Sequence, residues 1–218
     1  MIDRARRIWP RASRPMATIA LCALVATGLQ GCIEMMVGTA VVGTLAASDR
    51  RTFGAQTEDK TIVIKGENRI ARLVGDSGHI NVNSFNRKVL LTGEVRDEAM
   101  KAAVEREAAA IEGVNSVVNE VAVAGISSFG SRSNDVLLQG KIKASFVDAR
   151  DLYANSVKVI VERGVVYLMG RVTEREAHLA TEITRGVSGV EKVVRVFELI
   201  DDNELKELSK TTLTPASK

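Results

Sequence analysis

Few side chains of this 218-residue sequence could act as nucleophiles, general bases or metal ligands, and they form no recognisable set. The histidines are His79 and His178, and the cysteines are Cys22 and Cys32. As argued below, Cys22 would be removed with a signal peptide and Cys32 would be acylated, so neither cysteine is free in the mature chain. No Ser/His/Asp or Cys/His arrangement can then be assembled, and the two histidines fall short of the three histidine or cysteine ligands of a zinc site. We interpret each histidine as an ordinary surface or boundary residue. We therefore expect no catalysis, no metal and no cofactor.

The carboxylates have the pattern of a solvated helix surface. Glu174, Glu176 and Glu182 are interspersed with Arg175 and Arg185 over a predicted helix. Alternating charges of this kind are typical of an exposed helix face. We therefore assign these carboxylates no catalytic role.

The N-terminus has the pattern of a secretion signal. Five arginines precede an apolar run over residues 16–29, which is shorter than the roughly 20 residues that span a bilayer. The run ends in Leu29-Gln30-Gly31-Cys32, which resembles the lipobox of bacterial lipoproteins. The alternatives are a plain signal peptide with an unrelated cysteine nearby, or an uncleaved signal anchor. Because Cys22 lies inside the signal, Cys32 would be the one cysteine of the mature chain.

The lipobox resemblance implies an N-acyl group and an S-diacylglycerol on Cys32. Three acyl chains exceed the two signals that stable anchoring requires. Ile33, rather than an aspartate, follows the cysteine, and the resemblance then implies the inner leaflet of the outer membrane, on the periplasmic side. The anchor would be covalent lipid, with no further cofactor.

The charge of the sequence depends on this processing. Residues 1–31 hold five arginines and one aspartate, so their removal changes the formal net charge from +3 to −1. The basic character of the whole sequence therefore belongs largely to the signal. We expect no nucleic-acid partner.

The rest of the chain contains an internal repeat. Residues 88–95 align with residues 165–172, and residues 80–82 align with 157–159 at the same offset of 77. Residues 111–114 align with 187–190 after a slip of one position. A repeated pattern of this length predicts one small domain present in two copies.

Each copy predicts the order helix, strand, strand, helix, strand. The first helix is expected at about 62–74 and 134–147, and turns at 86–87 and 163–164 separate two strands of period-two alternation. The fold class is α+β, with two tandem αββαβ domains. Each domain would have a three-stranded mixed sheet with two helices on one face. Such small cores are marginal alone, so docking of the two copies would stabilise both, but the sequence leaves open whether they dock.

Seven residues are predicted to have structural roles. Gly93 and Gly170 would end the second strands, where a Cβ atom would obstruct the bend or the close packing. Thr173 and Glu176 form a predicted capping box, and Asp97 is the corresponding cap in the first copy. Gly113 and Gly189 would stop the second helices in a left-handed conformation.

The repeated motifs carry a family resemblance. Gly93-Glu94-Val95 followed by Gly113-Val114 and Val118-Asn119-Glu120-Val121, and residues 168–177 in the second copy, resemble the BON domain, a bacterial module of OsmY and nodulation proteins. With the lipobox and the duplication, residues 32–200 are similar to dual-BON outer-membrane lipoproteins. The predicted parts are a lipoprotein signal peptide (1–31), a lipidated N-terminus and tether (32–60), BON domain 1 (61–124), a linker (125–133), BON domain 2 (134–200) and a polar tail (201–218).

The resemblance implies contact with anionic phospholipid through the first helix of BON domain 2. Leu138, Ile142 and Phe146 fit one buried stripe of that helix. The candidate phospholipid-binding residues on the neighbouring faces are Val136, Leu137, Gly140, Lys141 and Ala144. Leu137 would insert shallowly while Lys141 meets the headgroups. Leu137 stands near the position where related proteins place an aromatic residue, and it would alternatively pack against the linker or the first domain.

Two functions therefore remain open. One is a non-catalytic lipoprotein that binds anionic phospholipid through BON domain 2 and supports outer-membrane integrity. The other is an envelope adaptor that binds a protein partner through the paired BON domains.

Overall fold

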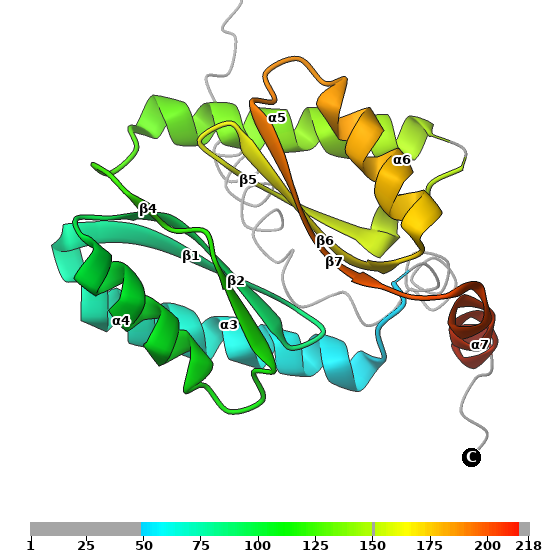
Figure 1. Ribbon diagram of the computed structural model, residues 1–218, viewed down its shortest axis with the longest axis horizontal. Helices are drawn as coiled ribbons and strands as arrows, with labels where there is room; N and C mark the ends of the chain where they lie inside the picture. The colour runs from blue at the N-terminus through cyan, green and yellow to red at the C-terminus, as the bar shows by residue number, and fades with distance from the viewer. Residues whose placement is uncertain (1–48, 150, 214–218) are drawn as a thin grey trace, which may run out of the picture. The chain divides into compact units, whose positions relative to one another are not determined.

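The computed structural model describes residues 49–149 and 151–213 (Figure 1). The predictions for the signal peptide, for Cys32 and for the tether up to residue 48 lie outside these residues. In the part of the chain that is described, no helix is both long and apolar enough to cross a membrane.

The first domain follows the predicted order of elements. A long helix and a 3₁₀ turn lead into a hairpin, a second helix and a final strand. These elements are α3 (Phe53–Val74), η1 (Gly75–Ser77), β1 (Gly78–Phe85), β2 (Lys88–Val95), α4 (Glu98–Ala109), β3 (Ser116–Asn119) and β4 (Ala122–Val123). Both β3 and β4 pair with β2 in parallel, so the predicted last strand is present in two pieces.

The second domain repeats this order and adds a C-terminal helix. Its elements are α5 (Phe129–Asp148), η2 (Ala154–Ser156), β5 (Val157–Glu162), β6 (Val165–Val172), α6 (Glu174–Arg185), β7 (Lys192–Leu199) and α7 (Asp202–Leu213). The hairpin strands β5 and β6 are antiparallel, and β7 returns parallel to β6. The predicted fold class, two αββαβ units with mixed sheets, is confirmed.

Each domain has its own apolar core between the sheet and its two helices (Figure 1). Leu91 and Val104 are fully buried in the first core, as are Leu168 and Ala180 in the second. Aliphatic side chains dominate both cores, in keeping with the low aromatic content of the sequence.

The opposite faces of the two sheets pack on each other. A third apolar cluster joins Phe85 and Leu90 of the first sheet to Ile160, Tyr167 and Met169 of the second. Asn86 Nδ2 also donates to Glu198 Oε2 across the boundary at 2.7 Å. This third apolar cluster buries additional apolar surface between the domains. Because burial of apolar surface is the main favourable contribution to folding free energy, the cluster stabilises both small domains.

A buried aspartate in the first helix of each domain holds the hairpin turn. Asp59 accepts hydrogen bonds from the backbone N–H groups of Asn86 (2.7 Å) and Arg87 (2.8 Å). Asp135 accepts the same pair of bonds from Arg163 and Gly164, at 2.9 Å each. All four turn residues have positive φ, as a two-residue turn with both central residues left-handed requires. The predicted turns are confirmed, whereas the role of the two aspartates was not predicted.

Several predicted boundaries were wrong. Helices α3 and α5 begin at Phe53 and Phe129, capped by Thr52 and Ser128, and not near residues 62 and 134. Helix α7 has 12 residues and lies within the segment predicted as a polar tail.

The close packing predicted at Gly93 and Gly170 and the left-handed backbone predicted at Gly113 and Gly189 are confirmed, but none of the four ends its strand or helix. Gly93 and Gly170 lie within β2 and β6, which continue for two further residues. A Cβ at Gly93 would lie 2.0 Å from the His79 carbonyl oxygen on the neighbouring strand. Gly113 and Gly189 have positive φ, but they follow the ends of α4 and α6 by several residues and lie in the next turn.

The capping box at the start of α6 is present. Glu176 accepts from the Thr173 backbone N–H at 2.9 Å, and the Thr173 hydroxyl accepts from the Glu176 N–H. Glu176 was expected on a solvated face, yet it is buried because it also pairs with Arg50. Asp97 caps α4 as predicted.

Candidate membrane-contacting face of helix α5

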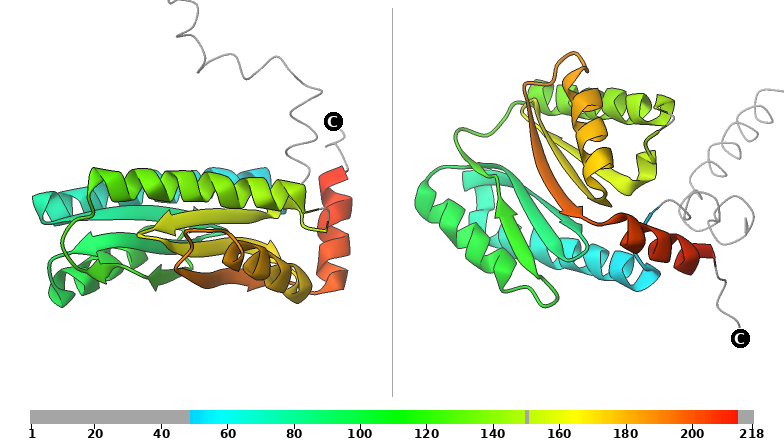
Figure 2. Two further views of the ribbon diagram at one scale, coloured as in Figure 1. Left: turned by 90° about the horizontal axis from the view of Figure 1, so that it is seen from above. Right: turned by 45° about the vertical axis from the view of Figure 1, so that its right-hand side comes forward.

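Helix α5 has one buried face, as predicted. Leu138, Ile142 and Phe146 follow each other at four-residue intervals and pack into the core of the second domain. Residues four apart lie on the same side of a helix, so these three fix which side of α5 faces outward. Helices α5 and α6 cover the same face of the β5–β6–β7 sheet (Figures 1 and 2).

The outward face of α5 is apolar. Four large apolar side chains on it are mostly exposed: Phe129 (81%), Val136 (67%), Leu137 (65%) and Val147 (73%). At 100° per residue, Phe129, Val136 and Val147 fall within about 20° of one line along the helix. Gly140 and Ala144, also exposed, lie beside this line. We refer to Phe129, Val136, Leu137, Gly140, Ala144 and Val147 as the α5 stripe.

Positive charges flank the α5 stripe on both sides. Lys141 is exposed on the side of Leu137, whereas Arg132 and Lys143 are exposed on the other side. Asp148 is the exposed acidic residue at the C-terminal end of the helix. An apolar strip between cations matches the requirements of a helix lying at the surface of an anionic bilayer.

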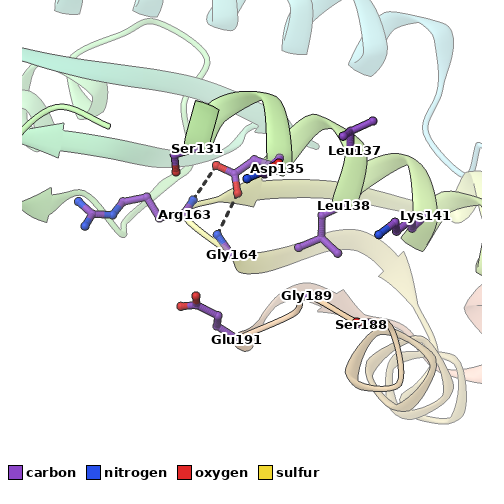
Figure 3. Close-up of a pocket in the computed structure, with 11 residues that line it drawn as sticks. Ser131, Asp135, Leu137, Leu138, Lys141, Arg163, Gly164, Ser188, Gly189 and Glu191 are labelled. Carbon is purple, nitrogen blue, oxygen red and sulfur yellow. Dashed lines mark hydrogen bonds between the residues drawn. The ribbon is translucent and has the colours of Figure 1, made fainter. Parts of the chain in front are cut away.

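The structure brings the five predicted phospholipid-contacting residues to this one face. Leu137 and Leu138 point to opposite sides of α5 (Figure 3). Because Leu137 is 65% exposed, the alternative that it packs against the linker or the first domain is wrong.

Two residues of the stripe were missed from the sequence. Phe129 was assigned to the linker, because the Gly/Ser-rich segment around it lacks helical periodicity. The signal that would have found it is Ser128, whose hydroxyl accepts the Ser131 N–H at 3.2 Å and so starts the helix. Phe129 supplies the aromatic residue near the helix start that the sequence analysis did not find. Val147, the last residue of the helix predicted at 134–147, was not among the predicted contact residues.

Beside the stripe lies a cleft of about 560 Å³ between α5 and two turns (Figure 3). Leu137 and Lys141 line it from α5, Arg163 from the β5–β6 turn, and Gly189 and Glu191 from the loop before β7. Asp135 also faces this cleft but is held by its two turn hydrogen bonds. The cleft therefore offers Lys141 to an anionic group, with Glu191 as an opposing charge, whereas the Arg163 guanidinium is directed away from the cleft and pairs with Glu94 at 3.6 Å (Figure 3).

The first domain provides an internal comparison. With an offset of 76, which aligns Asp59 with Asp135, the positions of Val136 and Leu137 are Lys60 and Thr61 in α3. Phe53 and Ile64 are the large apolar side chains exposed on the corresponding face of α3. Since Lys60 and Thr61 occupy these two positions in the same fold, the BON fold does not require Val136 and Leu137 to be apolar, whereas Phe53 aligns with Phe129.

The remaining candidate residues lie apart from this face. His178 is exposed on α6, and Gly113 lies in the first domain. His79 is half-buried beside the carboxylates of Glu94 and Glu162.

Comparisons with known proteins agree with the fold. The model of the BON domain family matches residues 56–125 and 134–201. The outer membrane lipoprotein DolP of Haemophilus influenzae is 37% identical over 190 residues, which cover 86% of this chain and 98% of DolP. A 21 kDa hemolysin of Actinobacillus pleuropneumoniae is 31% identical over 158 residues, covering 70% of this chain and 79% of the hemolysin.

Among solved structures, CdsD, a structural protein of the type III secretion system of Chlamydia trachomatis, is similar over 72% of this chain and all of the CdsD chain. The two share 12% identity with a TM-score of 0.29. The two family matches cover more than half of the sequence. The chain belongs to the BON-domain family, with two copies of the domain.

Proposed function

We propose that this chain is a periplasm-facing outer-membrane lipoprotein whose second BON domain contacts anionic phospholipid through the α5 stripe. The observation that carries the proposal is the exposure of four large apolar side chains on the outward face of α5, three of them along one line, between basic residues. The proposal involves no catalytic step and no cofactor beyond the lipid on Cys32. Its consequence for the cell would be support of outer-membrane integrity.

The physical chemistry of the stripe favours a membrane over solvent. Transfer of an exposed leucine or phenylalanine out of water contributes about 1.5–3 kcal/mol. A basic residue near an anionic leaflet contributes about 1 kcal/mol. Together, the apolar side chains and the flanking lysines give weak but additive contacts, and these suffice for a chain that is already anchored.

The anchor itself is part of the proposal. The lipobox pattern at Cys32 and the 37% identity to an outer membrane lipoprotein support attachment by an N-acyl and S-diacylglycerol group. Local tethering raises the effective concentration of α5 at the bilayer. The α5 contact would therefore orient the domains rather than recruit them.

The alternative, an adaptor acting through the paired domains, has less support. Binding through the sheets would require free sheet faces, and these faces cover each other in the third apolar cluster. A protein partner would have to use the helical surfaces or the strand edges.

Vesicle co-sedimentation tests the proposal. A fragment of residues 33–218, which has no cysteine and no acyl group, is mixed with phosphatidylglycerol-rich or phosphatidylcholine vesicles at moderate salt. The anionic vesicles should retain more protein, and Leu137→Glu should reduce retention at least tenfold. Equal retention by both vesicle types would contradict the proposal.

The matched control is Thr61→Glu at the corresponding position of α3. Both variants place a carboxylate on an exposed helix face, so neither should unfold the protein. Only the substitution in α5 should affect vesicle binding. Equal effects of the two variants would indicate nonspecific repulsion by added negative charge.

A further inference from the structure

Three possible metal ligands meet at the boundary of the two BON domains. One ligand atom from each of His79, Glu94 and Glu162 lies within 4.8 Å of the other two. His79 and Glu94 are direct partners in the β1–β2 ladder, whereas Glu162 is the last residue of β5. The cluster therefore draws on both domains.

The cluster is buried and incompletely hydrogen-bonded. Glu94 is 0% exposed and Glu162 is 6% exposed. Among the described residues, neither oxygen of Glu94 nor His79 Nδ1 has a hydrogen-bond partner. Arg163 Nη1 approaches Glu94 Oε1 at 3.6 Å, which is an ion-pair distance but not a hydrogen bond. A carboxylate buried in this state is costly unless a cation compensates it.

Glu162, in contrast, is already oriented. Asn81 Nδ2 donates to its Oε2 at 2.7 Å, and the Thr92 hydroxyl donates to the same oxygen at 3.4 Å. Both donors belong to the first domain. Outer hydrogen bonds of this kind fix ligating carboxylates in metal sites.

The BON fold does not require these residue types. At the offset of 77, His79 and Glu94 correspond to Ser156 and Arg171, and Glu162 corresponds to Phe85. Ser156 donates to the Tyr153 carbonyl, and Arg171 pairs with Glu198. The second copy of the domain thus folds with unrelated residues at these positions, so the cluster needs an explanation other than the fold.

We propose that His79, Glu94 and Glu162 bind one divalent transition-metal cation of the Zn²⁺ class between the two domains. One imidazole nitrogen and two carboxylate oxygens are an accepted zinc donor set, with water as the fourth ligand. Metal–ligand distances of about 2.1 Å require donor atoms about 3.4 Å apart in a tetrahedral site, so small side-chain rotations would close the site. The dication would neutralise both carboxylates and displace the half-exposed Arg163 side chain from Glu94.

Metal titration of the full chain tests this inference. The untagged protein is purified in detergent, freed of metal with chelator and titrated with ZnCl₂ in a calorimeter. One Zn²⁺ per chain should bind. Glu94→Gln and Glu162→Gln should each weaken binding at least tenfold, whereas His178→Ala, which removes the exposed histidine, should have no effect. Co²⁺ should give visible absorption bands that Glu94→Gln abolishes.

Substitution of Arg163 distinguishes a metal site from an ion cluster that Arg163 completes. If Arg163 is merely displaced by the metal, Arg163→Asn should tighten Zn²⁺ binding several-fold, and asparagine tolerates the left-handed backbone found there. Circular dichroism checks that each variant is folded. Absence of binding, or binding unchanged by both glutamate variants, would overturn the proposal and leave an ion cluster closed by Arg163. Vesicle binding should not change in these variants, so this test is independent of the proposed lipid contact.

Discussion

Arg50 and Glu176 form a bidentate ion pair between the segment before the first domain and the first turn of α6 in the second. The two hydrogen bonds measure 2.7 and 2.6 Å, and about nine-tenths of each side chain is buried. The next residue, Arg51, pairs with Asp59 of the first domain at 2.8 Å. Arg50 therefore pairs with the second domain and Arg51 with the first. These ion pairs attach residues 50 and 51 to both domains at the domain boundary.

We predict that Glu176→Gln destabilises the protein by about 2–3 kcal/mol, because the amide retains the helix cap but leaves the buried Arg50 charge without its partner. Urea unfolding at neutral pH measures this loss. Glu174→Gln is the matched control, since that side chain is 69% exposed and pairs with Arg195 only at 3.6 Å. Its effect should stay within about 0.5 kcal/mol. Equal losses in the two variants would contradict a structural role of the Arg50 pair.

A second prediction concerns Lys158, which lies at the domain boundary with its Nζ 3.3 Å from the Ser84 carbonyl oxygen. Burial, and then repulsion from Arg51, lower the pKa of Lys158 to about 8. Above this pH the folded protein releases a proton that the unfolded chain still binds. The free energy of unfolding should therefore rise between pH 8 and the ordinary lysine pKa of 10.5.

Comparison with Lys158→Met isolates this contribution from other groups that titrate in the same range. Urea unfolding at pH 7.5 and 9.5 should show that the wild-type protein gains stability relative to the variant. Parallel behaviour of the two proteins would mean that Lys158 has an ordinary pKa.

Alanine substitution should have opposite effects on stability at two glycines, Gly93 and Gly140. Gly93 has φ of 112°, and a Cβ there would meet the backbone of β1, so Gly93→Ala should cost about 3 kcal/mol or more. Gly140 lies in α5 with no heavy atom within 4 Å of an added Cβ. Gly140→Ala should therefore stabilise the protein by about 0.5–1 kcal/mol. Thermal unfolding of both variants checks the order, and stabilisation by Gly93→Ala would refute the close approach.

The fold was largely predictable because its pattern is present twice. The repeated spacing of glycines, alternating valines and turn residues predicted the order of elements and the buried stripe of α5. The extended N-terminal turns of α3 and α5 were not predictable from periodicity, because Thr57, Thr61, Ser131 and Ser133 carry no apolar signal there. Local capping by Thr52 and Ser128 starts these turns.

Long-range contacts explain the other failures. Asp59 and Asp135 accept hydrogen bonds from turns 27 to 29 residues away. Sequence neighbours alone do not reveal these bonds, and a charged residue without known partners is expected at the surface. The repetition of an aspartate at equivalent positions was the one available signal. Glu94 and Glu162 come together only when the two domains dock, which no pattern within one copy describes.

The exposed lysines of α5 should also contribute to membrane contact, each by less than a large apolar side chain. Lys141→Gln and Lys143→Gln should each weaken binding of the 33–218 fragment to anionic vesicles about fivefold, corresponding to about 1 kcal/mol. The difference should shrink at high salt, because screening acts on exposed charges. Lys60→Gln, on the equivalent helix of the first domain, serves as the control. A loss for Lys60→Gln as large as for Lys141→Gln would point to a general charge effect.

The central claim is that α5, and not the equivalent helix α3, enters the surface of an anionic membrane. Because the 33–218 fragment contains no cysteine, single cysteines can be introduced by Val147→Cys, Val136→Cys and, in α3, Thr61→Cys, and labelled with a polarity-sensitive fluorophore. On addition of phosphatidylglycerol vesicles, the emission of the two α5 labels should shift to the blue while the α3 label stays unchanged. An unshifted α5 label, or an equal shift at Thr61, would contradict the account.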